Sequence, residues 1–369
     1  MSKKILIDAS NNEETRVAVI ADGKLDDYEI ESSKKNAIKG EVYLAKITRV
    51  EPSLQAAFVD FGSNRNGFLP LTEIHPDYFK IPIADQDKLT KLLKNLKNDS
   101  SAGGEELETN KEEKLDDDGL NGINNDLDEN NLKHKQKDVK KDYLNFFKKY
   151  KIQDVIKPRQ VILVQVNKEE RGFKGAALTT FLSFAGRYCV LMPNSLNNDG
   201  ISRKIDDAEE RKKLKDIIES INIPEKMSVI IRTAGIGKTK KEISKDLDFL
   251  TSEWNKIREK TLKSSAPTLI YEEGNLIKRT IRDMVSNDVD EVIIDGKDGY
   301  EIAKKYAKKI VPQYLKSIKL FKNKDKTLFN DNNIENQIND LFSLKINLNS
   351  ETSFPIISFR QQYAYFRTR

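Results

Sequence analysis

Aromatic and basic side chains alternate with apolar residues in the stretch from Gly40 to Pro70. The period of two predicts neighbouring antiparallel strands, on which Phe58 and Phe68 would stand close together. Exposed rings on a sheet are platforms for nucleic-acid bases, and cations beside them hold the phosphates. Rings in such strands are, however, more often ordinary core residues. The basic residues nearby are Lys46, Arg49 and Arg65.

A second place for phosphate chemistry is the dipeptide Arg232-Thr233. A guanidinium fork and a hydroxyl can both donate hydrogen bonds to one phosphate group, whereas an arginine at a strand end can equally form an ordinary salt bridge. The residues from Gly235 to Thr239 resemble the phosphate loop of nucleotide hydrolases, but that motif requires a glycine where Arg232 stands. The spacing therefore excludes nucleotide hydrolysis.

Two aspartates, Asp8 and Asp295, each end a predicted strand and could belong to a two-metal nuclease centre. Two acids without further carboxylate partners rarely hold a metal pair, so a structural role is the prediction. Neither His75 nor His134 has a ligand partner at a useful spacing. The single cysteine, Cys189, excludes a disulfide framework and a cysteine-rich zinc site, and it fits a reducing compartment.

The charge of the chain is unevenly distributed. The net charge is +5, but residues 99–131 hold twelve Asp or Glu against two Lys, which leaves +15 on the rest. This surplus suits a polyanionic partner, although a Lys- and Asn-rich composition set by codon bias would produce it too. No apolar run approaches the roughly 20 residues of a membrane span, and charge precedes any secretory segment. A cytoplasmic protein is expected.

The hydrophobic pattern places these residues on a series of strands and helices. The length of 369 residues allows two or three domains. Strands are expected within 4–32 and 39–70, and a strand at 161–166 would close a barrel. Residues from about 84 to 150 have no such pattern and predict a disordered acidic insertion. Further strands are expected at 188–192, 227–233, 268–271 and 291–295, and helices at 207–221, 240–262, 276–286 and 300–310.

Several of these stretches, in this order, resemble a known family. The pattern of Gly40–Val50, Ala56–Gly62 and Gly67–Pro70 resembles the S1 domain, an RNA-binding barrel of the OB type. Longer stretches resemble the N-terminal half of the bacterial ribonuclease E/G family, from residue 1 to about 348, interrupted by the insertion. These stretches are Ile47–Gly62, Lys168–Thr180, Gly200–Arg203 and Ile231–Gly235.

The resemblance implies an α/β multidomain fold, in which an S1 barrel is inserted into a split ribonuclease H-like subdomain. That subdomain is structural in the family, which argues against catalysis by Asp8 and Asp295. The expected parts are 1–36 and 266–348 for the two ribonuclease H-like portions, 37–180 for the barrel with its insertion, 181–265 for a mixed α/β 5′-sensor region and 349–369 for an aberrant tail.

The resemblance also implies a function, which is Mg²⁺-dependent endonucleolytic cleavage of single-stranded RNA in ribosomal RNA processing and messenger RNA decay. The residues that match the RNA grip of the family's S1 domain are Phe58, Phe68 and Lys174. The residues that match its sensor of a 5′-monophosphate are Gly186, Val190, Arg232 and Thr233.

The chain departs from the family pattern after Ser350. The family continues with a Gly-Gly turn and an Ile-Asp-Val-Asn-Ser segment in a DNase I-like subdomain whose aspartates bind the metal, and neither motif follows here. The cysteine motif that links protomers through zinc is also absent, which argues against a homo-oligomer. We expect a truncated chain that binds RNA, and a separately encoded C-terminal half would supply catalysis. The alternative is an inert RNA-binding module or pseudogene product. The insertion would tether two strands or repel RNA as its mimic, and tethering is preferred.

Overall fold

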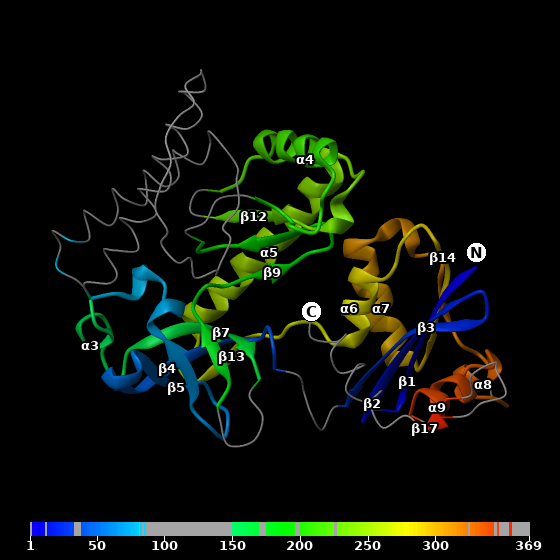
Figure 1. Ribbon diagram of the computed structural model, residues 1–369, viewed down its shortest axis with the longest axis horizontal. Coiled ribbons are helices and arrows are strands. Elements are labelled where there is room, and N and C mark those ends of the chain that lie inside the picture. Colours follow the sequence, from blue (N-terminus) through cyan, green and yellow to red (C-terminus); the bar gives the residue numbers. More distant parts are fainter. Residues whose placement is uncertain are drawn as a thin grey trace, which may run out of the picture. The chain divides into compact units, whose positions relative to one another are not determined.

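The computed structural model describes two compact units (Figure 1). Unit 1 comprises residues 1–37 and 274–369, and unit 2 comprises residues 38–273. The described residues are 2–11, 13–32, 38–80, 82, 85, 150–169, 175–195, 200–224, 227–323 and 325–340, with the backbone alone at 341–342, 345–346 and 354–355. The insertion predicted at about 84–150 and the tail predicted at 349–369 lie almost entirely outside this part of the chain.

Unit 1 is built on a mixed sheet of five strands. In spatial order these are β15 (Ile318–Leu320), β14 (Val289–Asp295), β1 (Lys3–Asn11), β2 (Glu14–Ala21) and β3 (Lys24–Ser32). β1 pairs in parallel with β14 and antiparallel with β2, so that segments far apart in the sequence form one sheet. The turn between β2 and β3 has positive φ at Asp22 and Gly23.

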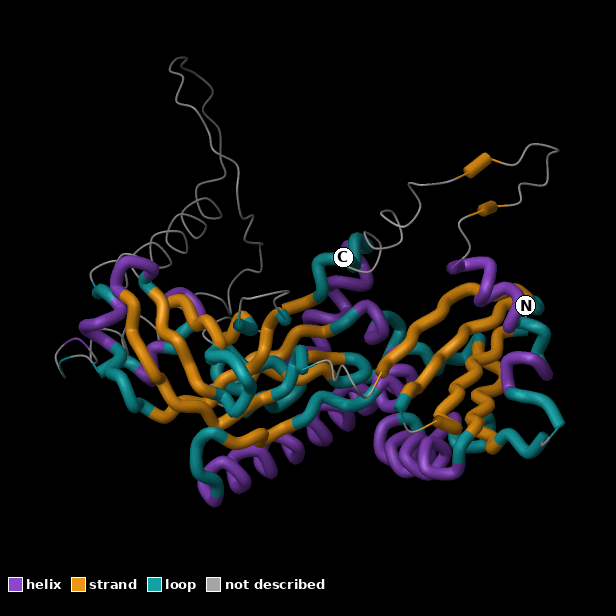
Figure 2. The backbone as a smooth tube through the Cα atoms, turned by 90° about the horizontal axis from the view of Figure 1, so that it is seen from below, coloured by secondary structure: helices purple, strands orange, loops and turns teal. Residues whose placement is uncertain are grey.

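Helices cover both faces of this sheet (Figure 2). They are α6 (Leu276–Asp283), α7 (Lys297–Ile310), η6 (Pro312–Tyr314), α8 (Leu328–Asp331) and α9 (Glu335–Phe342). Ile5 and Ile7 share a core with α6 and α7, whereas Leu6 shares a second core with α8 and α9. The uninterrupted apolar run Ile5–Ile7 within β1 follows from this arrangement, because a strand segment buried on both faces has no polar side. Two short strands, β16 (Lys345–Ile346) and β17 (Phe354–Pro355), pair with each other.

Unit 2 contains a closed barrel of five strands. In spatial order these are β4 (Val42–Glu51), β5 (Ala56–Asp60), β6 (Gly67–Pro70), β8 (Ala177–Thr179) and β7 (Val161–Lys168), and β7 pairs with β4 to close the ring. The prediction that residues 161–166 close the barrel is confirmed. Short helices in the connections are η2 (Pro52–Leu54), η3 (Leu71–Glu73), η4 (Pro76–Tyr78) and α3 (Ile152–Val155).

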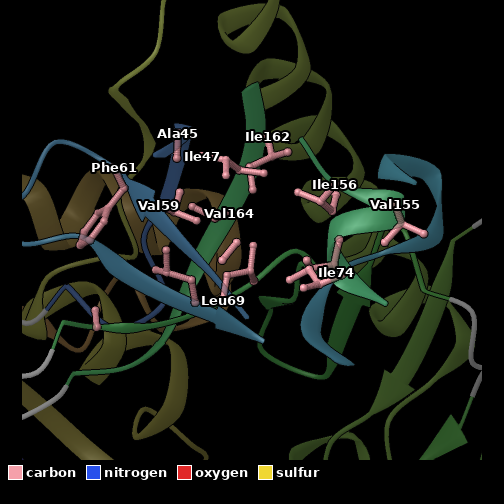
Figure 3. Close-up of a cluster of buried hydrophobic side chains, with 14 of the residues drawn as sticks. Ala45, Ile47, Val59, Phe61, Leu69, Ile74, Val155, Ile156, Ile162 and Val164 are labelled. Carbon is pink, nitrogen blue, oxygen red and sulfur yellow. The ribbon is translucent and has the colours of Figure 1, made fainter. Parts of the chain in front are cut away.

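The barrel encloses a hydrophobic core (Figure 3). Successive strands contribute Ile47, Val59 and Leu69, all of them fully buried. α3 adds Ile152 and Val155 to the same core. Side chains of a strand point alternately to its two faces, so the residues between these positions lie on the outside of the barrel.

A second sheet and two long helices also belong to unit 2. The strands, in spatial order, are β11 (Gly200–Ile201), β12 (Ser228–Ile231), β10 (Cys189–Met192) and β9 (Phe184–Ala185). The helices are α4 (Ala208–Ser220) and α5 (Lys240–Lys263), and η5 (Thr233–Gly235) lies between β12 and α5. Val42 and Leu44, from the outside of the barrel, share a core with Leu191 of β10 and Leu250 of α5. The barrel and this layer are therefore packed together.

One predicted strand has a partner that the sequence did not indicate. The strand expected at 268–271 is present as β13 (Thr268–Tyr271), but it pairs with β4 at the barrel and not with a strand of unit 1. Unit 2 accordingly extends to residue 273, beyond the boundary expected after residue 265. An apolar run reveals a strand, whereas its partner is decided by long-range register.

The predicted helices at 207–221, 240–262, 276–286 and 300–310 are all present as α4, α5, α6 and α7. Their ends agree with the predicted ends to within three residues, and capping groups fix some of these ends. α5, for example, begins after Thr239, whose side chain accepts a hydrogen bond of 3.3 Å from the backbone N–H of Glu242. In the described part of the chain, no helix combines the length and apolar character needed to cross a membrane.

Candidate nucleic-acid interface

Phe58 and Phe68 lie side by side on the outside of the barrel. They stand opposite each other on β5 and β6, with ring centroids 6.1 Å apart and ring planes at 69°. Both are half-buried, and neither belongs to the barrel core, which takes Ala57, Val59 and Leu69 from beside them. The alternation that turns those three residues inwards turns both rings outwards. Core packing, which the sequence left open, is therefore not the role that the structure gives these rings.

A bulge in β4 brings Arg49 onto one of the rings. The pairing of β4 with β5 shifts between Ile47 and Arg49, so that Arg49 stands opposite Phe58 with Cζ 4.7 Å from the ring centroid. Bulges re-aim side chains, and a guanidinium over an aromatic face is a favourable cation–π contact. Thr48 donates a hydrogen bond of 2.9 Å to the carbonyl of Phe58 and accepts one of 3.2 Å from Asn66. These bonds link the residue before Arg49 to the backbone of Phe58.

Of the other cations predicted for this surface, two lie among the described residues and one does not. Lys46 on β4 and Arg65 in the loop before β6 are exposed to solvent. Lys174 lies outside the described residues. The described surface of the barrel therefore combines two aromatic faces with a guanidinium on one of them and further exposed cations.

The loop between β9 and β10 meets the end of β12 at Arg232. Nη1 of Arg232 donates a hydrogen bond of 2.5 Å to the carbonyl of Gly186, and its backbone N–H donates one of 2.8 Å to the carbonyl of Tyr188. Thr233 is the first residue of η5 and is exposed, whereas Val190 lies on β10 and is half-buried. The structure thus brings Gly186 and Arg232 into contact, with Thr233 next along the chain and Val190 on the adjoining strand.

Asp246 of α5 belongs to this loop's surroundings and was missed by the sequence reasoning. The residue is 6% exposed, and its carboxylate accepts hydrogen bonds from the backbone N–H groups of Arg187, Tyr188 and Cys189, at 3.1, 2.8 and 3.1 Å. A signal was available, because Asp246 follows Ile243 at the spacing of the buried stripe of α5. An acid at a core-facing position needs buried hydrogen-bond donors.

Basic side chains gather around the ring of Tyr188. Cζ of Arg187 lies 5.3 Å, and Nζ of Lys238 lies 5.6 Å, from the ring centroid. Hydrogen bonding to Thr239, and then the charges of Lys238 and Arg187, lower the pKa of Glu242, which is therefore an anion beside these cations. The loop that resembles a nucleotide-binding loop thus starts α5 and carries one cation of this group.

Asp8 and Asp295 stand opposite each other on β1 and β14 of unit 1. Arg16 donates a hydrogen bond of 2.5 Å to Asp8, and the hydroxyl of Ser10 donates one of 2.6 Å. Burial by itself would raise the pKa of Asp8, but these hydrogen bonds outweigh it and lower that pKa, whereas burial and the nearby Asp8 raise the pKa of Asp295. Among the residues described, no three His, Cys, Asp or Glu side chains form a group that could hold a metal ion.

His75 is the histidine that the structure describes. His75 is buried, its Nδ1 accepts a hydrogen bond of 3.2 Å from the backbone N–H of Asp77, and it caps η4. Its own backbone N–H donates to the hydroxyl of Thr180 at 2.5 Å, which indicates a structural role. His134 lies outside the described residues.

The comparisons with known proteins agree on one family. Residues 183–357 match the model of the ribonuclease E/G family. The chain is 37% identical over 354 residues to ribonuclease E of Haemophilus influenzae, a match that covers 96% of this chain and 31% of that protein. It is 35% identical over 355 residues to a putative ribonuclease E of Buchnera aphidicola subsp. Baizongia pistaciae, covering 96% of this chain and 71% of that protein.

Ribonuclease G of Escherichia coli strain K12 is a more distant relative, 26% identical over 350 residues, with 95% of this chain and 59% of that protein covered. The chain spans about 30% of the length of the ribonuclease E proteins of H. influenzae and E. coli that it matches. Against the Buchnera protein, the likeness extends over most of both chains. This chain therefore belongs to the ribonuclease E/G family.

Proposed function

We propose that this chain is the RNA-binding portion of a ribonuclease E/G-type endoribonuclease, which grips single-stranded RNA and senses a 5′-monophosphate. Processing of ribosomal RNA and decay of messenger RNA are the roles that this proposal assigns. The observation that carries it is the pair of rings, Phe58 and Phe68, turned outwards on a closed barrel with Arg49 over one of them. Two aromatic faces beside a cation suit stacked bases and the phosphates between them.

The energetics of such a surface favour single strands. Each base stacked on an aromatic ring contributes about 1 to 3 kcal/mol, and a duplex cannot offer its bases in this way. Exposed cations, here Arg49, Lys46 and Arg65, add an attraction that weakens as salt is raised, because counterions are released from the RNA. In this proposal Lys174 supplies a further contact.

The proposed place for the 5′-monophosphate is the end of β12. Arg232 is held by the carbonyls of Gly186 and Tyr188, and the exposed hydroxyl of Thr233 follows it. A guanidinium and a hydroxyl donate to a compact dianion, and bonds between charged partners are the strong ones. Val190 would then lie beside the first nucleotide.

In the same proposal the closed barrel is an S1 domain, and unit 1 is a ribonuclease H-like scaffold that does no cutting. The order β4-β5-β6-β8-β7 and the shared core support a barrel of this kind. The mixed sheet of unit 1, with β14 parallel to β1, supports the scaffold. The engagement of Asp8 by Arg16 fits a structural use of that aspartate.

Cleavage of RNA is proposed for the whole enzyme, and from family membership alone. Mg²⁺ is the ion that the family implies, and the described residues do not provide a group of carboxylates that fits it. No step is therefore derived through the metal, and no described residue is assigned to the reacting centre.

Incubation of the purified chain with a 5′-monophosphorylated oligoribonucleotide and Mg²⁺ tests the enzyme against the inert binding module. Binding with no cleavage is the expected result for this chain. Sustained cleavage that a chelator abolishes would show that the chain carries a reacting centre of its own.

Substitution of one ring tests the RNA grip. Phe58→Ala should weaken the binding of an unstructured oligoribonucleotide by about 1 to 3 kcal/mol, measured by fluorescence anisotropy. Leu262→Ala is a control, since this side chain is 87% exposed at the end of α5 and should leave affinity unchanged. If Phe58→Ala instead unfolded the barrel in a thermal melt, the ring would belong to the core and the site would be wrong.

A further inference from the structure

The loop from Gly186 to Cys189 is gripped from one side by a single carboxylate. Oδ1 of Asp246 accepts the N–H of Arg187 at 3.1 Å, and Oδ2 accepts the N–H groups of Tyr188 and Cys189 at 2.8 and 3.1 Å. The thiol of Cys189 also lies 3.4 Å from Oδ2 and donates to it. Three consecutive backbone N–H groups of the loop thus converge on one carboxylate.

The same loop presents carbonyl groups to Arg232. The carbonyl of Gly186 accepts from Nη1 of Arg232, and the carbonyl of Tyr188 accepts from its backbone N–H. The N–H of Gly186 donates to the carbonyl of Cys189 at 2.8 Å and closes the turn. Asp246 therefore contacts the N–H side of a loop whose carbonyl side orients the arginine, so a change at the carboxylate is transmitted to the guanidinium through the backbone.

Gly186 is explained by the same carboxylate. A Cβ at this position would lie 2.5 Å from Oδ2 of Asp246 and 2.9 Å from Cδ1 of Leu250. Both distances are below any normal contact, so a side chain at residue 186 would displace the carboxylate. Glycine is needed here because α5 approaches the backbone closely, and not because the backbone is strained.

We infer that Asp246 is a positioning residue for recognition of the 5′-phosphate, holding the loop whose carbonyls aim Arg232 at the ligand. The inference rests on the proposed function, because it takes Arg232 as the phosphate ligand. By this inference the carboxylate of Asp246 favours the binding of a phosphate, although both groups are anions. Three backbone N–H groups and a thiol donate hydrogen bonds to the carboxylate and so stabilise its negative charge.

The direction in which one substitution changes the affinity for the 5′-phosphate distinguishes a positioning role from a purely electrostatic role. Asp246→Asn removes a negative charge near a phosphate pocket, which by Coulomb's law alone would strengthen phosphate binding. The amide nitrogen of asparagine cannot accept a hydrogen bond, so the bonds to one side of the loop are lost and Arg232 is released. A positioning role therefore predicts weaker binding of the 5′-phosphate, and a purely electrostatic role predicts stronger binding.

The experiment compares one oligoribonucleotide in two forms, 5′-monophosphorylated and 5′-hydroxyl, on the full chain. The preference for the phosphorylated form is the Kd of the 5′-hydroxyl RNA divided by the Kd of the 5′-monophosphorylated RNA. In Asp246→Asn this ratio should fall toward one, by about tenfold or more, because a charge-assisted hydrogen bond to the phosphate is lost. The affinity for the 5′-hydroxyl form should stay the same. Asp248→Asn, an identical change at an exposed position of the same helix, should leave both affinities unchanged.

The only cysteine of the chain gives a readout that needs no RNA. Cys189 is fully buried, and burial and the neighbouring Asp246 raise the pKa of its thiol, so alkylation of the folded chain should be slow. Release of the loop in Asp246→Asn should speed alkylation by iodoacetamide about tenfold or more at a temperature well below the melting transition. Asp248→Asn should alkylate like the parent chain.

The RNA-binding and alkylation measurements distinguish the proposed phosphate pocket from the inferred role of Asp246. If the parent chain binds both RNA forms equally, the proposed phosphate pocket fails, and alkylation still decides whether Asp246 holds the loop. An unchanged or larger Kd ratio in Asp246→Asn, or an unchanged alkylation rate, would overturn the inference. Should Asp246→Asn not fold, Gly186→Ala provides the second variant, since its Cβ displaces the carboxylate without removing its charge and should give the same loss of ratio and the same faster alkylation.

Discussion

The two proposed RNA contacts of unit 2 are built in different ways. Phe58 and Phe68 need only the pairing of β5 with β6, two strands that follow each other in the chain. The loop at Gly186 needs Arg232, 46 residues further on, and Asp246 beyond it. A stacking surface is thus a product of local alternation, whereas a pocket for a small anion requires several segments to converge.

The difference has a physical origin in what each ligand requires. Every base has a broad flat face, so stacking on aromatic rings tolerates any base sequence. A phosphate is recognised by donors at fixed distances, and buried polar groups must all be satisfied to keep those distances. We expect the ring pair to tolerate changes around it and the phosphate loop to be sensitive to them.

The largest expected effect is on the free energy of unfolding, which should depend on whether a residue faces the inside or the outside of the barrel. Leu69→Ala should lower the free energy of unfolding by about 2 to 5 kcal/mol, because Leu69 is fully buried and its removal leaves a cavity. Phe68→Ala, one residue earlier and facing outwards, should lower it by about 1 kcal/mol or less. Urea denaturation measures both. Equal losses for the two variants would place the ring of Phe68 in the core and remove the stacking surface.

An intermediate effect is expected from pH, which should act on one contact and not on the other. A phosphate monoester loses its second negative charge as pH falls through about 6. The preference of the chain for a 5′-monophosphorylated over a 5′-hydroxyl oligoribonucleotide should therefore fall several-fold between about pH 7.5 and pH 5, since Arg232 then faces a monoanion. Binding of the 5′-hydroxyl form, which depends on the rings, should change little. A parallel loss for both forms would mean that one surface binds both.

The smallest expected effect concerns the cation on the ring. Arg49→Ala should weaken RNA binding by about 0.5 to 1 kcal/mol through loss of the cation–π contact and of its attraction for phosphate. It should also reduce the slope of log Kd against log salt by about 1. Arg258→Ala, which removes the same charge at an exposed position of α5, is the matched control and should leave the slope unchanged. Equal effects of the two substitutions would show that the net charge of the chain, and not the position of Arg49, determines the affinity for RNA and its salt dependence.

The sequence by itself predicted most of the longer elements and their order. Alternation predicted the hairpins of β1 to β3 and the strand at 161–166 that closes the barrel, and amphipathic spacing predicted α4, α5, α6 and α7. These predictions succeeded because period and capping are local properties of the chain. The motifs, which are likewise short stretches of sequence, were sufficient to indicate the family.

Tertiary structure decided what each element contacts. The sequence left Phe58 and Phe68 open between core and surface, and only the register of the barrel turned them outwards. It did not indicate that β13 pairs with β4, and it did not indicate Asp246, whose N–H partners lie 57 to 59 residues away. Periodicity fixes which side of an element is apolar, but the groups opposite that side come from distant segments, and only packing brings them there.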